Sequence, residues 1–220
     1  MPSAARIKFE ENKKDVDQLW QIHEEIGGQG PGRKYGVDVI NRASIVFITA
    51  CWESFIEDLA VEAFDFLVVN VPNALALPTK VRDLATKALF EQKDSRRVWD
   101  LADAGWRKII ANHRAATLER WVDTLNTPKT AQVNRLFEEL VGFSNVSAQW
   151  HWQNMSQAQA EAKLDQYISI RGNIAHRTEH NETIYKNWIA DYMGHVSYLV
   201  DQTEISVAAH LVTLTGKQPW

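Results

Sequence analysis

The chain has 220 residues, 45% of them hydrophobic, and a formal net charge of −4 at neutral pH. This length and hydrophobic content allow one domain with a full core, and the negative charge argues against a general nucleic-acid binder. The single cysteine excludes both a disulfide framework and a cysteine zinc site.

The N-terminal segment, Met1-Pro2-Ser3-Ala4-Ala5-Arg6, is followed by charged residues instead of an apolar core, which predicts that there is no signal peptide. No apolar run approaches the 18 residues that a membrane-spanning helix needs. We therefore expect a cytoplasmic protein that does not cross a membrane.

The first two predicted helices cover residues 9–26 and 38–70. Between them, Gly27-Gly28-Gln29-Gly30-Pro31-Gly32 is a helix breaker, and it lacks the spacing of a dinucleotide-binding or P-loop motif, so a connector is expected. The 38–70 helix is apolar on most sides, which is typical of a helix buried all round in a core or a subunit interface.

One polar line runs along this second helix. It consists of Thr49, Glu53 and Glu57, spaced four residues apart. Two carboxylates at this spacing repel each other unless a cation lies nearby. Arg171 is a candidate for that cation, and a surface lysine or simple exposure of the carboxylates is the alternative.

The middle of the chain predicts a linker over residues 71–78 and shorter helices over 79–90, 95–113, 117–125 and 128–142. Trp99, Trp106 and Trp121 recur with aliphatic residues at helical spacing, so we expect them in the core and not as stacking platforms for bases. Residues 80–135 hold twelve Lys or Arg and seven Asp or Glu. Their net charge of +5 would suit a phosphate backbone, although ordinary solvated helix faces give the same count.

The last two predicted helices cover residues 156–176, starting at a Ser-x-x-Gln capping box, and 182–213. The loop before them carries Trp150-His151-Trp152, which we expect to pack on the helices as a lid. No stretch has the period of a β-strand. The predicted fold is all-α: one domain over residues 1–220, built as a four-helix bundle with a helical insertion, residues 72–155, between its second and third helices.

The stretch Arg171-Gly172-Asn173-Ile174-Ala175-His176 ends the third bundle helix. Arg171 falls in the middle of an apolar stripe, where a guanidinium needs anionic or carbonyl partners or a wet cleft. His176 lies about 140° further round an ideal helix. Either the helix ends between them, which Gly172 would ease, or another element or subunit completes the site. A core ion pair and a histidine at a helix C-terminus are the structural alternatives.

This Arg-x4-His stretch resembles the signature motif of the HEPN superfamily. Residues 50–59 resemble the long second helix of its RiboL-PSP-like branch, and residues 128–142 resemble the segment before the motif helix. In many members an Asn directly follows the Arg, whereas here Gly172 precedes Asn173. The resemblance implies a homodimer in which each subunit contributes one motif to a shared site.

The same resemblance implies a metal-independent endoribonuclease, acting as a toxin or phage-defence effector held in check by an antitoxin or other regulatory partner. Arg171 and His176 would be its catalytic residues, with Asn173, Glu53 and Glu57 in support. The apolar second helix and the Arg in a core stripe also predict a homodimer, formed through residues 164–176 and part of the 38–70 helix. A non-catalytic HEPN-like dimer that binds RNA or nucleotide, or acts as a scaffold, is the alternative.

An Arg and a His without an obvious nucleophilic Ser or Cys suit RNA cleavage by the RNA's own 2′-hydroxyl, which requires no metal and no cofactor. The competing reading is a metal site, because His176 and His180 flank Glu179, with Glu182 beyond. No third ligand is specified, so we predict that no metal is bound.

Overall fold

The computed structural model describes residues 1–28, 34–91, 95–122, 128–176 and 183–220. Its α-helices are α1 Ala4–Gly27, α2 Asp38–Asn70, α3 Thr79–Glu91, α4 Gly105–Val122, α5 Thr130–Val141, α6 Gln157–His176 and α7 Lys186–Thr215. Within these ranges the β-structure is limited to one isolated bridge, so the predicted all-α class is confirmed. None of the helices, as far as the chain is described, is long and apolar enough to cross a membrane.

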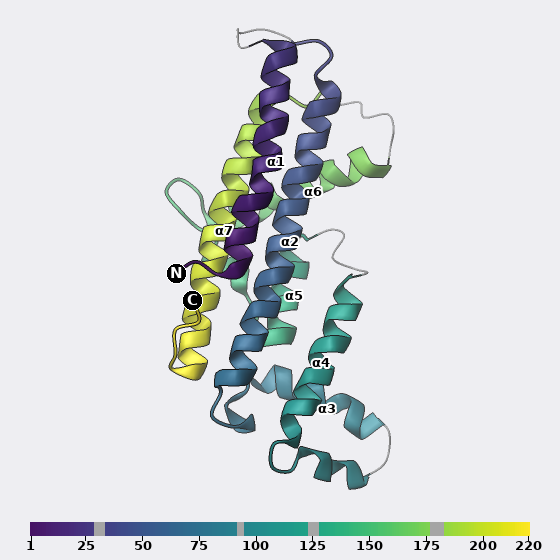
Figure 1. The fold of residues 1–220 in the computed structure, drawn as a ribbon, viewed down its shortest axis with the longest axis vertical. Helices are drawn as coiled ribbons and strands as arrows, with labels where there is room; N and C mark the ends of the chain where they lie inside the picture. The colour runs from purple at the N-terminus through teal and green to yellow at the C-terminus, as the bar shows by residue number, and fades with distance from the viewer. Residues whose placement is uncertain (29–33, 92–94, 123–127, 177–182) are drawn as a thin grey trace.

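Helix α2 is the central element of the molecule. It packs against α1, α5, α6 and α7. In Figure 1, α1, α2 and α7 run alongside one another, whereas α6 passes α2 obliquely and its C-terminal end emerges at the side. Apolar residues of α3, α4 and α5 join the same buried cluster as those of the other helices. The division into a bundle and an insertion over residues 72–155 stays a prediction.

Two buried tryptophans connect α2 to the rest of the core. Trp52 is fully buried, and its indole N–H donates to the carbonyl oxygen of Pro128 at 3.1 Å. Its ring and that of Trp150 form a T-shaped pair with 5.8 Å between centroids, and the indole N–H of Trp150 donates to the hydroxyl of Thr203 at 2.9 Å. Both indoles bury a large apolar surface and satisfy their single donor. The start of α5, the loop before α6 and helix α7 are thereby fixed relative to α2.

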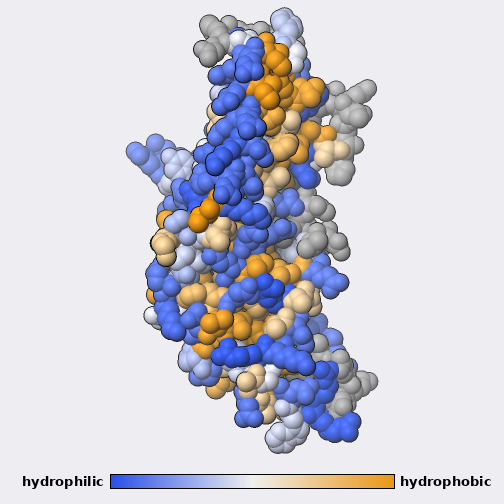
Figure 2. Space-filling model, viewed as in Figure 1, coloured by the Kyte–Doolittle hydropathy of each residue, from blue (hydrophilic) through white to orange (hydrophobic). Residues whose placement is uncertain are grey.

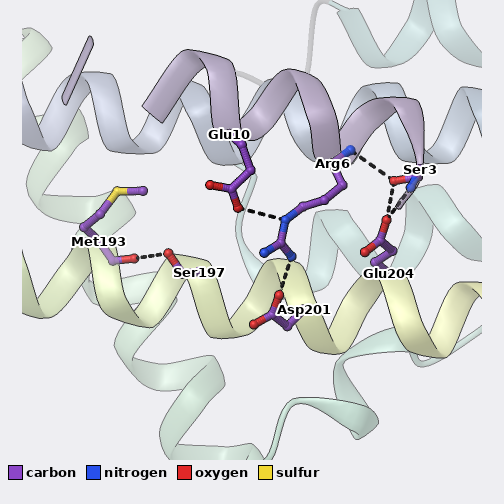
Figure 3. A network of polar contacts seen from close by, with 7 residues as sticks. All are labelled: Ser3, Arg6, Glu10, Met193, Ser197, Asp201 and Glu204. Carbon is purple, nitrogen blue, oxygen red and sulfur yellow. Dashed lines mark hydrogen bonds and ion pairs between the residues drawn. The ribbon is translucent and has the colours of Figure 1, made fainter. Parts of the chain in front are cut away.

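The start of α1 is attached to α7 by a polar network (Figure 3). The Ser3 hydroxyl accepts from the backbone N–H of Arg6 at 3.0 Å, which makes Ser3 the N-cap of α1. Ser3 also donates to the Glu204 carboxylate from its N–H and its hydroxyl, at 2.7 and 2.6 Å. Arg6 pairs with Glu10 at 2.9 Å and with Asp201. Helix α1 is thus joined to α7 by charge as well as by packing.

The prediction of separate helices over residues 95–113 and 117–125 is wrong. A 3₁₀ helix, Ser95–Leu101, is followed by a turn and then by the single helix α4. The turn depends on Gly105, because a Cβ atom there would lie 2.0 Å from the carbonyl oxygen of Asp100. The helix therefore continues through residues 114–116, where the prediction placed a break. The chain breaks earlier, at the turn between Leu101 and Gly105.

Helix α5 differs from its prediction at the start and agrees at the end. Pro128 lies before the helix and not at its first position, and the N-cap is Lys129, which makes no side-chain cap. Asp165 of α6 replaces the cap: its carboxylate accepts from the N–H and hydroxyl of Thr130, at 2.9 and 3.0 Å. Gly142, the last residue of the predicted range, ends α5 in the left-handed conformation. The capping contact also positions α6 against α5.

The starts of the last two helices were predicted with unequal success. The capping box before α6 is confirmed, because Ser156 donates from its N–H to the Gln159 side chain at 2.9 Å. Helix α7 begins at Lys186, four residues after the predicted start. The predicted first residue, 182, lies outside the described part of the chain.

The tryptophans of the middle segment do not all follow the core prediction. Trp121 is buried and Trp106 is half-buried against the core, as predicted. Trp99 is 79% exposed, so its assignment to the core is wrong. The lid prediction is confirmed: Trp150 is buried, and Trp152 stacks on Tyr198 of α7 at 4.9 Å between ring centroids.

Buried His195 connects α7 to α6 and makes the stability of the fold depend on pH. Its Nε2–H donates to the carbonyl oxygen of Ala160 at 3.1 Å, and burial lowers its pKa to about 4. An unfolded His titrates near pH 6.5, so between about pH 6.5 and 4 the unfolded state binds a proton that the folded state does not. Stability therefore falls as the pH drops through this window, by up to about 3 kcal/mol.

We expect urea denaturation at pH 7 and pH 4.5 to reveal this loss in the wild type. His195→Gln keeps a donor for Ala160 but cannot titrate, so the difference between the two pH values should be smaller by the contribution of His195. Equal pH dependence in both proteins would contradict the assignment.

Candidate functional site

The Arg-x4-His motif lies at the C-terminal end of an unbroken helix. Helix α6 continues through Gly172 to His176, so the alternative that the helix ends between the two motif residues is wrong. Positions 171 and 176 are therefore about 140° apart around the axis of an ideal helix. One straight helix does not present both on one face. If the two residues act on a single phosphate, another element or a second subunit has to complete the site.

The motif residues differ in their exposure. Arg171 is half-buried, whereas Asn173 is exposed. His176 is the last residue of α6, and its side chain lies outside the part of the chain that the structure describes. The same holds for residues 177–182, which include three of the four residues of the alternative metal site. Among the described residues no group of His, Cys, Asp and Glu is arranged to hold a metal ion.

Arg171 lies close enough to the polar line of α2 to influence it. Burial and the negative charge of Glu57 raise the pKa of the Glu53 carboxyl, and the positive charge of Arg171 opposes that rise. Glu57 also has a raised pKa, but there burial and Asp58 raise it and Lys8 is the cation that opposes them. The structure thus brings Arg171 near Glu53, and it associates Glu57 with a different cation.

A layer of hydroxyl groups lies between α2, α6 and α7 in the same region. The hydroxyls of Thr49 and Tyr192 are 3.0 Å apart, and the ring of Tyr192 stacks on that of Tyr167 at 4.1 Å between centroids. Tyr167 donates to the Asp191 carboxylate at 3.0 Å. Burial raises the pKa of Tyr192, and its hydrogen bond to Thr49 and the charge of Arg171 oppose the rise. Arg171 is therefore near two ionisable groups, one on each neighbouring helix.

Tyr192 is not among the site residues predicted from the sequence. The available signal was its hydroxyl group among the apolar residues of the last helix. The sequence offered nothing to connect that hydroxyl with Thr49, which lies 143 residues earlier.

An apolar surface adjoins the end of the motif helix. Figure 2 shows hydrophobic atoms over the upper part of α2, on the side where the end of α6 emerges in Figure 1. Val39 and Phe47 of α2 are 67% and 44% exposed. They are eight residues apart, about 80° around the helix axis, so both lie within one broad helix face. The core of a single chain therefore does not cover α2 on all sides, and its burial in a subunit interface stays a prediction.

The basic middle segment lies at the other end of the molecule. Helices α3 and α4 occupy the lower end of the view in Figure 1, far from the end of α6. Several of its cations form ion pairs: Arg114 with Asp65 at 2.8 Å, and Arg120 and Arg135 with buried Glu139. Much of the local positive charge is thus matched within the chain.

Comparison with known proteins identifies the family. The family model described as RiboL-PSP-HEPN matches residues 9–209, which include α2, α5 and the motif helix. No curated protein and no solved structure matches the chain. The match covers most of the sequence and agrees with the all-α fold. The chain belongs to the RiboL-PSP branch of the HEPN superfamily.

Proposed function

We propose that this protein is a metal-independent endoribonuclease of HEPN type that uses Arg171 and His176 in a site shared by two subunits. One observation carries the proposal: the Arg171 guanidinium is half-buried near Glu53 and Tyr192, on the helix that ends at His176. A half-buried cation near the end of a helix, beside an exposed apolar surface, fits a phosphate site at a dimer interface.

The chemistry follows from the two side chains. His176 accepts the proton of the RNA 2′-hydroxyl, or donates one to the departing 5′-oxygen. The 2′-oxygen attacks the adjacent phosphorus, the bond to the 5′-oxygen breaks, and a 2′,3′-cyclic phosphate remains on the upstream fragment. Arg171 binds the charged phosphoryl oxygens with two parallel N–H donors. One subunit supplies one acid or base, and the second subunit supplies the other.

The supporting residues have unequal roles in this proposal. Glu53 restrains Arg171 through its charge and keeps the guanidinium directed toward the site. Asn173 is exposed and offers an amide to the RNA strand. Glu57 is influenced by Lys8 and not by Arg171, so its contribution is the smallest.

The proposed dimer uses the exposed apolar face of α2. We expect the wild type to have the mass of a dimer at micromolar concentration, measured by sedimentation equilibrium. Val39→Glu combined with Phe47→Glu places two charges in the interface and should give a monomer with strongly reduced cleavage. Val69→Glu is the matched control, because Val69 is also exposed on α2 but lies near the opposite end of the helix. A wild type that sediments as a monomer would contradict the dimer.

Cleavage is expected to persist in EDTA and to leave a 2′,3′-cyclic phosphate, because the nucleophile comes from the substrate. A strand with one 2′-deoxyribose at the cleaved position should be cut at other positions only. Mass spectrometry of the fragments checks both statements. If EDTA abolishes cleavage, or the deoxy position is still cut, the metal site through His176 and His180 becomes the better explanation.

The exposed apolar surface also fits the second candidate function, a non-catalytic dimer that binds RNA or nucleotide or acts as a scaffold. Expression in cells separates the two. The endoribonuclease, as a toxin or phage-defence effector in the cytoplasm, should stop growth and degrade RNA in a manner that His176→Ala removes and an antitoxin-like partner suppresses. The non-catalytic dimer should leave RNA intact in both proteins.

A further inference from the structure

A pocket separate from the Arg-x4-His motif lies at the end of the bundle where α1 ends and where α2 and α7 begin. Its volume is about 480 Å³, within the range of pockets that bind small ligands. Neither Arg171 nor the residues near it line this pocket. The residues that matter for its chemistry are His23, Lys34, Asp38, Asn41, Tyr185 and Lys186.

Two side chains in the pocket wall are buried and incompletely hydrogen-bonded. His23 is 2% exposed and Asn41 is 4% exposed. The Asn41 amide donates to the carbonyl oxygen of Ile184 at 2.7 Å, which fixes its orientation. Its Oδ1 atom and the Nδ1 atom of His23 have no hydrogen-bond partner within the described structure. Buried polar atoms are rarely left without partners, so these two atoms indicate a ligand with hydrogen-bonding groups.

The beginnings of two helices meet at the pocket. The N-cap residues of α2 and α7 are Val37 and Tyr185, and neither makes a side-chain cap. The first N–H groups of a helix lack intrahelical partners, and the helix dipole makes that end positive. Two uncapped helix starts in one pocket therefore favour an anionic group, as phosphate sites at helix N-termini do.

The charged side chains at the pocket have different effects: Lys34 favours an anion, whereas Asp38, in the first turn of α2, is an acceptor that keeps an anion away from its own side of the pocket. Lys186 donates to Glu24 at 2.7 Å and lies 4.3 Å above the ring of Trp20, so its position is fixed. Lys34 has no ion pair with any described residue, and its cation is available to an anion. Asp38 is exposed and can accept from a hydroxyl group. The pocket thus combines an anion site with neutral and acidic hydrogen-bonding groups.

We propose that this pocket binds one nucleotide. Its phosphate contacts Lys34 and the two helix starts, and an amino group of its base donates to Asn41 Oδ1 beside His23. Asp38 accepts from a ribose hydroxyl. The assignment of the nucleotide to an RNA strand rests on the proposed function, since the wall residues 183–187 follow the motif by only a few residues. A free mononucleotide offers the same chemistry.

Binding is tested in the full chain carrying His176→Ala, so that the RNA stays intact during the measurement. Calorimetric titrations use AMP, a short single-stranded RNA and inorganic phosphate. We expect AMP or the RNA to bind and Lys34→Gln to weaken that binding about tenfold. Lys34 is not in the core, so this variant keeps the fold. Lys108→Gln, an exposed lysine on α4, is the matched control and should bind as the parent does.

Nitrogen NMR of the histidine rings gives the second readout, because only a ligand in this pocket should shift the His23 Nδ1 signal. Binding of AMP identifies a site for free nucleotide, and binding of the RNA alone identifies a strand subsite; either supports the proposal. No binding, equal affinity for phosphate and AMP, or binding unaffected by Lys34→Gln would overturn it. Cleavage by the wild type is measured separately, so loss of the pocket and failure of the proposed catalysis are distinguishable.

Discussion

Arg171→Ala is expected to lower the rate of RNA cleavage by at least about 10²-fold, the usual loss when one preorganised donor to a developing negative charge is removed. Arg171→Lys should fail as well, because an ammonium group cannot reproduce the planar, two-pronged grip of a guanidinium. His176→Ala should lose about 10²- to 10⁴-fold, the range for a general acid or base. Single-turnover cleavage of a labelled RNA measures all three.

The control for the arginine variants is Arg114→Ala, which removes a guanidinium that pairs with Asp65 far from the motif. It should retain full activity. All variants should keep the wild-type circular dichroism spectrum and the dimer mass, because Arg171 is only half-buried. Cleavage that survives Arg171→Ala or His176→Ala at the wild-type rate would exclude this motif from the mechanism.

Trp52→Ala is expected to lower the free energy of unfolding by about 3–5 kcal/mol, the cost of truncating a large aromatic side chain in a core. Trp52 of α2 is fully buried and packs against the Trp150 ring, and its loss also leaves the Pro128 carbonyl oxygen without its donor. Because a domain is stable by only about 5–15 kcal/mol, this change should remove a large part of that stability.

Urea denaturation followed by circular dichroism measures the loss. Trp99→Ala is the matched control, since it deletes the same side chain at a position that is 79% exposed; its free energy of unfolding should change by less than about 0.5 kcal/mol. Similar destabilisation by the two variants would contradict the role of Trp52 in connecting α2 to the rest of the core.

The sequence by itself determined most of the long helices and the location of the motif. The bounds of α2 agree with the predicted 38–70, and the Ser156 capping box and Gly142 mark helix ends correctly. These features depend on residues within one or two helical turns of each other. Hydrophobic periodicity and capping patterns therefore predict them directly from the sequence. The two further stretches of family resemblance, residues 50–59 and 128–142, also lie within the matched range.

Only the tertiary structure decided which distant groups meet. Arg171 was one possible cation for Glu53 and Glu57. Packing of α6 on α2 places Arg171 near Glu53, whereas the cation that acts on Glu57 is Lys8. Packing likewise placed Tyr192 beside Thr49, and it left Val39 and Phe47 exposed on a helix that is apolar on most sides. Helical periodicity describes the faces of each helix separately, whereas these contacts depend on how helices cross, and that is set by the fit of all their side chains together.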